Sequence, residues 1–313
     1  MSSVVPALGL AEDDVRDVLE TASLAPSRYN AQPWRFALHP DRIELHGDPG
    51  GLLEAADPEW REVRLSCGTA LLNARLALQG LGIRPLVTLL PGRGAIGALA
   101  VVRRGGRFTA TDESRSLLDA VGTRRTNRLP FLDTEVPVEH RQHLVRAAEL
   151  ERSWLHVVGA DADRERLRNL VLRAHRAQLA DPAAVEVSAS EVESALSNPW
   201  ALHDFSPEPV ERPPDTFVVV LCSFYDGPQA ELQAGQALQR MLLAAAALGL
   251  SASFLSQVVE VRRVREELRR ALGGSLFPQS VLRLGFGAPA PPTPRKPVED
   301  LILAPCGVEP ESG

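Results

Sequence analysis

The sequence is poor in cysteine and carries no excess of positive charge. It has 3 cysteines among 313 residues, and they lie far apart: Cys67, Cys222 and Cys306. Neither a disulfide framework nor a metal-binding cysteine cluster has that spacing, so no metal is expected. The formal net charge of −6 argues against nucleic acid or an anionic membrane as a partner.

Long apolar runs are also missing. The most apolar stretch, residues 241–255, is interrupted by Gly249 and two serines and is too short to span a bilayer. The start of the chain has no basic segment followed by an apolar one, so no signal peptide is expected. Apolar residues still make up 44% of the chain, enough for a large core in one or two domains. A cytoplasmic protein is therefore expected.

Lysine is nearly absent. Of 34 lysines and arginines, only Lys296 is a lysine, which leaves 33 arginines. A coding bias towards arginine explains most of this imbalance. The lone lysine follows Arg295 in a segment bracketed by prolines, which draws attention to this basic pair.

The chain contains an internal repeat. Residues 66–84 align without a gap with residues 233–251, and such self-similarity decides the fold class. Both stretches predict helices that are apolar nearly all round and that end at a glycine suited to the left-handed cap position. Chance similarity between two Ala/Leu-rich helices is the alternative explanation. The glycines aligned at both ends argue against it: Gly68 matches Gly235, and Gly82 matches Gly249.

The repeat extends more weakly to both sides. Residues 18–24 resemble residues 144–150, and in each copy a tryptophan then opens a predicted strand. Each half is therefore expected to be an α+β unit with a buried helix packed on a sheet. The expected halves are residues 1–115 and 116–313. Further strands rich in Val, Ile and Phe are predicted at residues 96–102, 217–222 and 280–286.

Residues 173–215 fit neither copy. This polar insertion contains several prolines together with Trp200 and Phe205. A connection of such length is typical of a lid, a binding loop or disorder. Disordered segments are poor in aromatic residues, so the insertion is interpreted as a lid that packs onto the rest of the molecule.

The segment after the first predicted helix, residues 24–36, carries the most specific motif. Pro26 and Pro33 stiffen it, and it is expected to display four polar side chains: Ser27, Arg28, Asn30 and Gln32. An ordinary capped turn would use the same residue types. The pattern Ala-Pro-Ser-x-x-Asn-x-Gln-Pro-Trp-x-Phe, however, closely resembles the flavin-binding loop of the nitroreductase-like flavoproteins.

Two basic motifs resemble other parts of the same family. Residues 124–128 read Arg-Arg-Thr-Asn-Arg, similar to the Arg-Arg-Ser-x-Arg that holds the ribityl phosphate of FMN in the family. Guanidinium groups offer paired N–H donors to phosphate oxygens, although a solvated basic turn would have the same sequence pattern. The pair Arg295-Lys296 follows Gly285-Phe286-Gly287, as a basic pair follows a Gly-x-Gly strand in the family; a surface tail is the alternative.

The resemblance implies FMN as the cofactor. The phosphate would be held by Arg124, Arg125, Thr126, Arg128, Arg295 and Lys296. The flavin ring would be held by Pro26, Ser27, Arg28 and Asn30. A backbone N–H near the end of residues 249–257 reaches the flavin N5 atom in the family, which points here to Ser256 or Gln257.

One departure from the family is informative. Ordinary members are homodimers with two FMN sites at the subunit interface. Here the first copy keeps the flavin loop and lacks the arginine motif, whereas the second keeps the arginine motif and lacks the loop. One composite site is therefore expected in an intramolecular pseudo-dimer, a monomer in solution. This arrangement resembles the Acg family, a single-chain subgroup of the nitroreductase-like proteins.

The implied activity is that of an oxidoreductase. NADH or NADPH would reduce FMN, and a nitro-aromatic or quinone-type acceptor would then take the electrons in a ping-pong cycle. Flavin supplies the hydride chemistry, so no catalytic side chain is assigned. A non-catalytic FMN storage protein, with the insertion over the flavin, is the alternative. An inactive scaffold is a third reading, which the retention of one full set of motifs opposes.

Overall fold

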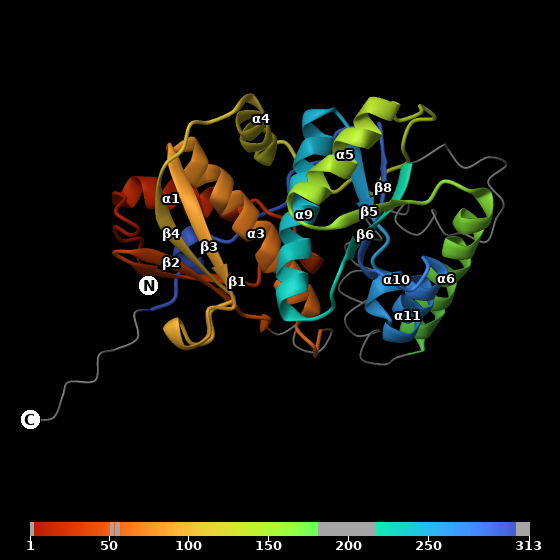
Figure 1. The fold of residues 1–313 in the computed structure, drawn as a ribbon, viewed down its shortest axis with the longest axis horizontal. Helices are drawn as coiled ribbons and strands as arrows, with labels where there is room; N and C mark the ends of the chain where they lie inside the picture. Colours follow the sequence, from red (N-terminus) through yellow and green to blue (C-terminus); the bar gives the residue numbers. More distant parts are fainter. Residues whose placement is uncertain (1–2, 51–52, 54–56, 181–216, 305–313) are drawn as a thin grey trace, which may run out of the picture.

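The computed structural model describes residues 3–50, 53, 57–180 and 217–304. Its helices and strands form two successive sets (Figure 1). The N-terminal set is α1 (Glu12–Ser23), β1 (Trp34–His39), β2 (Arg42–Gly47), α3 (Arg61–Gly80), β3 (Ile83–Leu89), β4 (Ala100–Arg107) and α4 (Asp112–Val121). The C-terminal set is α5 (Val138–Leu150), β5 (Trp154–Val157), α6 (Asp161–Leu179), β6 (Phe217–Ser223), α9 (Pro228–Ala247), β7 (Ser251–Phe254), α10 (Gln257–Glu260), α11 (Arg262–Ala271) and β8 (Phe277–Gly285).

Each set builds a four-stranded antiparallel sheet, and the two sheets have equivalent strand orders. The first is ordered β1-β2-β4-β3 and the second β5-β6-β8-β7. In the first set α3 connects the second and third strands, and in the second set α9 does the same. The internal repeat is therefore confirmed as a repeat of topology, with β6 taking the place of β2 and β8 that of β4.

Helices α3 and α9 lie against each other at the centre of the molecule (Figure 1). Most of their residues are buried, because each helix packs on its own sheet and on the other helix. Both predicted cap glycines have left-handed backbones, with φ of 76° at Gly82 and 73° at Gly249. The paired helices therefore form the junction between the two halves.

Each half also completes the core of the other. Leu65 of α3 belongs to the apolar cluster of the C-terminal half, and Leu232 of α9 belongs to that of the N-terminal half. These two leucines occupy matching positions in the repeat, three residues before the paired glycines Gly68 and Gly235. The exchange is thus symmetric, as at an interface between two related subunits.

The C-terminal arm (residues 289–304) returns to the N-terminal half (Figure 1). Ile302 forms a parallel bridge with Phe36 of β1, and the Leu303 N–H donates to the Phe36 carbonyl at 2.9 Å. Leu301 is fully buried in the core of that half. The arm therefore ties the last residues of the second copy to the first.

Some predicted boundaries differ from the structure. The strand predicted at residues 96–102 begins at Ala100, because Ile96 lies in the β3–β4 connection, where its side chain is 88% exposed. The helix predicted to end at Gly82 ends two residues earlier, at Gly80, with Gly82 in the left-handed position just before β3. The expected boundary between the halves, after residue 115, falls inside α4.

The predicted insertion, residues 173–215, starts inside α6, which continues to Leu179. Residues 181–216 lie outside the described residues, so the lid stays a prediction. Among the helices that the structure describes, none has the length and apolar composition needed to cross a membrane.

Candidate functional site

The α1–β1 loop (residues 24–33) has an unusual backbone. Tyr29, Asn30 and Gln32 all have positive φ, at 54°, 55° and 51°, although none of them is glycine. Such left-handed residues are strained and persist only where surrounding contacts hold them. One of these contacts is local, because the Gln32 N–H donates to Ser27 Oγ at 3.0 Å.

Gln32 holds this loop from within instead of displaying a side chain. It is 3% exposed, and its Nε2 donates to the Asn30 carbonyl at 3.2 Å. Its Oε1 accepts from the Lys296 N–H at 2.9 Å. The expectation that Gln32 would be displayed is therefore wrong: its amide is used to join the loop to the C-terminal arm.

The basic pair of the arm lies directly on the loop. Arg295 Nη1 donates to Asn30 Oδ1 at 3.0 Å, and its Nη2 donates to the Leu24 carbonyl at 3.3 Å. Lys296 Nζ donates to the Ala31 carbonyl at 2.7 Å. Burial lowers the pKa of both Arg295 and Lys296, and neighbouring arginines lower these pKa values further. The loop of one half and the arm of the other thus form one unit.

The arginine motif is positioned by β7. Thr126 forms a parallel bridge with Ala252, and the Asn127 N–H donates to the Ala252 carbonyl at 2.8 Å. The buried Asn127 side chain donates to the Ala288 carbonyl at 2.8 Å. Asn127 was not assigned a site role from the sequence, yet it fixes the motif against the start of the arm.

Sterics explain why glycine stands at both ends of the Gly-x-Gly segment that ends β8. A Cβ atom at Gly285 would lie 3.0 Å from the Phe131 ring, and one at Gly287 would lie 2.8 Å from Asn127 Nδ2. Phe131 itself forms an antiparallel bridge with Gly287. Both glycines therefore let the arginine motif and the residues after it approach the strand closely.

Arg124 is the most unusual residue of the cluster. Arg124 is 4% exposed, and within residues 3–50, 53, 57–180 and 217–304 its guanidinium has one hydrogen-bond partner, the Leu24 carbonyl, 3.4 Å from Nη2. Its Nε and Nη1 atoms have no hydrogen-bond partner within the described part of the chain. Burial, together with the like charges of Arg295 and Arg125, lowers its pKa to about 10. A buried cation among cations is costly unless an anion compensates it.

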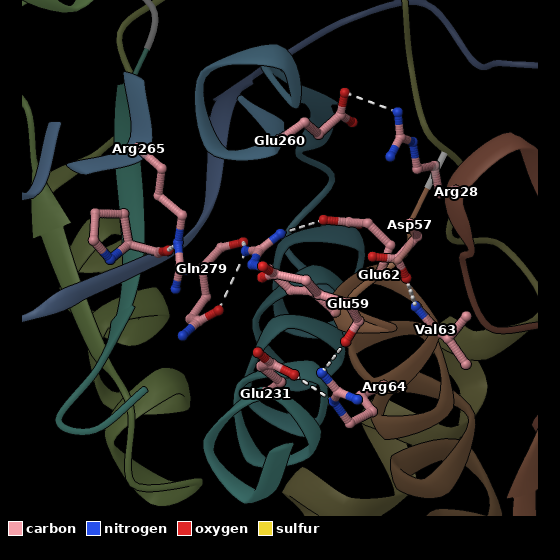
Figure 2. Close-up of polar contacts among 12 residues, drawn as sticks. Arg28, Asp57, Glu59, Glu62, Val63, Arg64, Glu231, Glu260, Arg265 and Gln279 are labelled. Carbon is pink, nitrogen blue, oxygen red and sulfur yellow. Dashed lines mark hydrogen bonds and ion pairs between the residues drawn. The ribbon is translucent and has the colours of Figure 1, made fainter. Parts of the chain in front are cut away.

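The other side of the α1–β1 loop contacts α10. Arg28 Nη2 lies 3.0 Å from Glu260 Oε2, and the two side chains point toward each other from different halves (Figure 2). Ser256 stands at the N-cap position of α10 without a side-chain capping hydrogen bond, and Gln257 is the first residue of the helix, where a helix leaves N–H groups without intrahelical acceptors. The loop therefore lies between the arm and α10.

Below this contact the two halves share further polar groups (Figure 2). Arg64 of α3 pairs with Glu231 of α9, and buried Arg61 contacts Gln279 of β8. Asp57 accepts from the Val63 N–H at 2.9 Å. The contacts of Arg64 and Arg61 fix the start of α3 against the C-terminal half, and Asp57 supports it from within the N-terminal half.

Contacts between the halves join some of the predicted site residues, such as Asn30 and Arg295. Pro26 accepts from Thr69 of α3 at 2.9 Å, and Arg125 donates to the Arg124 carbonyl at 2.8 Å. Arg128 is exposed, and in the ranges that the structure describes no recorded hydrogen bond or ion pair joins it to the loop or the arm. Its assignment to the phosphate stays a prediction.

The described cysteines are packing residues. Cys67 and Cys222 are fully buried, and burial raises the pKa of both thiols, to about 12 for Cys222. A raised pKa keeps a thiol protonated and unreactive. Among the described residues, no group of three or more metal-ligating side chains occurs.

The fold is that of a single chain with two fused α+β repeats, and a cationic cluster lies where the C-terminal arm meets the α1–β1 loop. The sequence model of the nitroreductase family matches residues 121–287. A Mycobacterium tuberculosis protein, provisionally named an NAD(P)H nitroreductase, is 30% identical over 93% of this chain and 91% of its own length. The chain therefore belongs to the nitroreductase family.

The chain is also similar, at lower identity, to a further relative and to solved structures. The Mycobacterium tuberculosis protein acg, also provisionally named an NAD(P)H nitroreductase, is 28% identical over 95% of this chain and 98% of its own length. A BluB-like flavoprotein structure from Clostridium difficile covers 60% of this chain and 96% of its own, at 18% identity and a TM-score of 0.44. A Desulfitobacterium hafniense nitroreductase with bound FMN covers 60% and 97%, at 19% identity and a TM-score of 0.43.

Proposed function

We propose that the chain binds one FMN between its two halves and uses it to pass electrons from NADH or NADPH to a nitro-aromatic or quinone-type acceptor. The observation that carries this proposal is Arg124: its guanidinium is buried, two of its nitrogen atoms have no hydrogen-bond partner among the described residues, and burial together with two neighbouring arginines lowers its pKa. A phosphate monoester supplies the negative charge and acceptor oxygens that such a cluster lacks.

The proposed phosphate end is built from two distant segments of the C-terminal half. Arg124, Arg125 and Thr126 come from the segment bridged to β7, and Arg295 and Lys296 come from the arm. Arg128 remains a proposed outer member because it is exposed. These residues fit the FMN phosphate chemically. The phosphate is anionic, and apart from Arg128 the site consists of buried or half-buried cations together with the Thr126 hydroxyl.

The proposed ring end uses the strained α1–β1 loop. Pro26, Ser27, Arg28 and Asn30 would hold the ring from the N-terminal half, and the N–H groups of Ser256 or Gln257 would face it from the C-terminal half. Rigid loops of this kind are suited to fixing a planar ligand. In support, hydrogen bonds from Gln32 and Arg295 already hold Asn30 in place.

FMN would supply the hydride-transfer chemistry, and the chain's residues would bind it, orient it and set its electrostatic surroundings. No side chain is required as an acid or base. In the proposed ping-pong order, the nicotinamide donor and the acceptor use the site one after the other. The names of the two mycobacterial relatives support the choice of donor. Because the pairing occurs within one chain, we propose a monomer.

A visible spectrum of the purified protein tests the proposal. We expect flavin absorption bands, and anaerobic NADH or NADPH should bleach them within seconds. A second electron acceptor such as menadione should then restore the oxidised spectrum. Bands that persist after addition of either nucleotide would favour FMN storage over catalysis, and failure to bind FMN at all would contradict the site.

A further inference from the structure

The ion pair between Arg28 and Glu260 connects the two segments that the proposed flavin ring would touch. Its two residues are 232 positions apart in the sequence, and Arg28 Nη2 lies 3.0 Å from Glu260 Oε2. Both side chains are largely shielded, with exposed fractions of 11% and 9%. Figure 2 shows them reaching toward each other across the junction. A shielded ion pair of this kind constrains geometry more than an exposed one does.

Each partner is also fixed on its own side. Arg28 Nη2 donates to the Tyr29 hydroxyl at 2.5 Å, and its guanidinium carbon lies 4.5 Å from the centre of the Tyr29 ring. Glu260 Oε2 accepts from Gln178 Nε2 of α6 at 2.7 Å. Val258 and Val259 anchor α10 in the core of the C-terminal half. The carboxylate is therefore held on a fixed element and is not a mobile surface group.

The position of Glu260 on α10 gives the pair its significance. Glu260 is the last residue of α10, one helical turn from Ser256 and Gln257, whose N–H groups were assigned to the flavin edge. Its own N–H donates to the Ser256 carbonyl at 3.2 Å. Any displacement of Glu260 is consequently transmitted to the start of the helix.

We infer that Glu260 is a positioning residue of the site: its carboxylate holds Arg28, and the pair fixes the spacing and the local charge of the two segments that face the flavin ring. This inference rests on the proposed function. Glu260 is not a catalytic residue, because it acts through Arg28 and through α10.

The inference predicts the direction in which each variant shifts the flavin potential. Reduction develops negative charge on a flavin ring, so a positive charge nearby favours the reduced form and a negative charge opposes it. Glu260→Gln keeps the shape of the side chain and raises the net charge of the pair by one. Arg28→Gln lowers that charge by one. The two variants should therefore shift the flavin potential in opposite directions, which a loss of packing alone would not do.

The experiment measures the midpoint potential of the FMN-loaded protein and the FMN dissociation constant for both single variants and the double variant. For Glu260→Gln we expect the preference for reduced over oxidised FMN to rise about tenfold, an upward shift of about 30 mV for a two-electron couple. Arg28→Gln should shift the potential downward, and the double variant should lie between the two. Inorganic phosphate affinity, measured on the flavin-free protein, should stay within about twofold of the unmodified value.

Glu267→Gln is the matched control. Glu267 of α11 pairs with Arg173 of α6 at 2.6 Å, also between two elements, but on the exposed surface. It should leave both the potential and the FMN affinity unchanged. Shifts of the same sign in the two single variants, or shifts no larger than that of the control, would overturn the inference. Failure of the unmodified protein to bind FMN would instead overturn the proposed function, and this inference with it.

Discussion

Gly68 of α3 and Gly235 of α9 meet backbone to backbone. A Cβ atom added to either glycine would lie 2.9 Å from the Cα atom of the other, and still closer to a leucine carbonyl oxygen of the facing helix. The two glycines are matching positions of the repeat, so each half contributes the same position to this contact. Only glycine allows the two helices to approach this closely.

Gly68→Ala should therefore force the central helices apart. We expect the free energy of unfolding to fall by about 3 kcal/mol, the upper part of the usual range for overpacking, because the obstruction is backbone that cannot rotate away. Chemical denaturation measures the change. Gly122→Ala is the control, since nothing lies within 4 Å of a Cβ there and φ is not positive; equal effects of the two substitutions would refute the close contact.

Arg124→Ala should weaken FMN binding much more than riboflavin binding. Hydrogen bonds to a charged group contribute about 1.5–3 kcal/mol, so the FMN dissociation constant should rise by roughly ten- to a hundredfold. Riboflavin lacks the phosphate, and its affinity should change little. Arg115→Ala removes an exposed arginine paired with Asp112 and serves as control. Parallel losses for the two flavins would place Arg124 away from the phosphate.

Leu301→Ala should detach the C-terminal arm. Leu301 is fully buried in the core of the N-terminal half, and truncating such a leucine typically lowers stability by about 2–5 kcal/mol. Because the same arm carries Arg295 and Lys296, FMN affinity should fall as well. Leu150→Ala, at a position 56% exposed, provides the comparison. An unfolding midpoint equal to that of the comparison variant would mean that the arm is not an anchor.

Glu44 should contribute to stability at neutral pH and lose this contribution in acid. Burial alone would raise its pKa, but hydrogen bonds with Arg42 and His46 and the nearby charge of His39 lower it below the ordinary value of 4.5. A carboxyl whose folded-state pKa is depressed stabilises above its unfolded-state pKa and ceases to do so as pH falls through the folded value.

The corresponding measurement compares the unmodified protein with Glu44→Gln from pH 7 to pH 3. The difference in free energy of unfolding should be constant above about pH 5 and should shrink below it. Glu135→Gln alters an exposed glutamate paired with Arg141 and should show much less pH dependence. A stability difference that grows on acidification would have the wrong sign for this account.

The repeat and the site motifs could be predicted because they are local patterns. The gapless alignment of two helices identified both α3 and α9 and their cap glycines, and the loop and arginine motifs are short and contiguous. Contacts between distant segments could not be predicted in this way. The pairing of Arg28 with Glu260, 232 residues apart, depends on how two halves dock, which no spacing in one sequence encodes.

The direction of individual side chains was the other feature that the sequence did not predict. Gln32 was expected to be displayed by a loop that two prolines stiffen, yet its side chain is buried where three residues have left-handed backbones. The start of β4 was placed too early because Ile96 looks like a strand residue, although its side chain is exposed in the preceding connection. In both cases tertiary context overrode local propensity.

Native mass spectrometry of the purified protein tests the central claim most directly, because it counts chains and flavins in the same particle. The account predicts one chain with one FMN, and loss of the FMN signal in Arg124→Ala while the chain remains intact. A particle of two chains with two FMN molecules, or one chain with two, would contradict a single site shared between the halves of one chain.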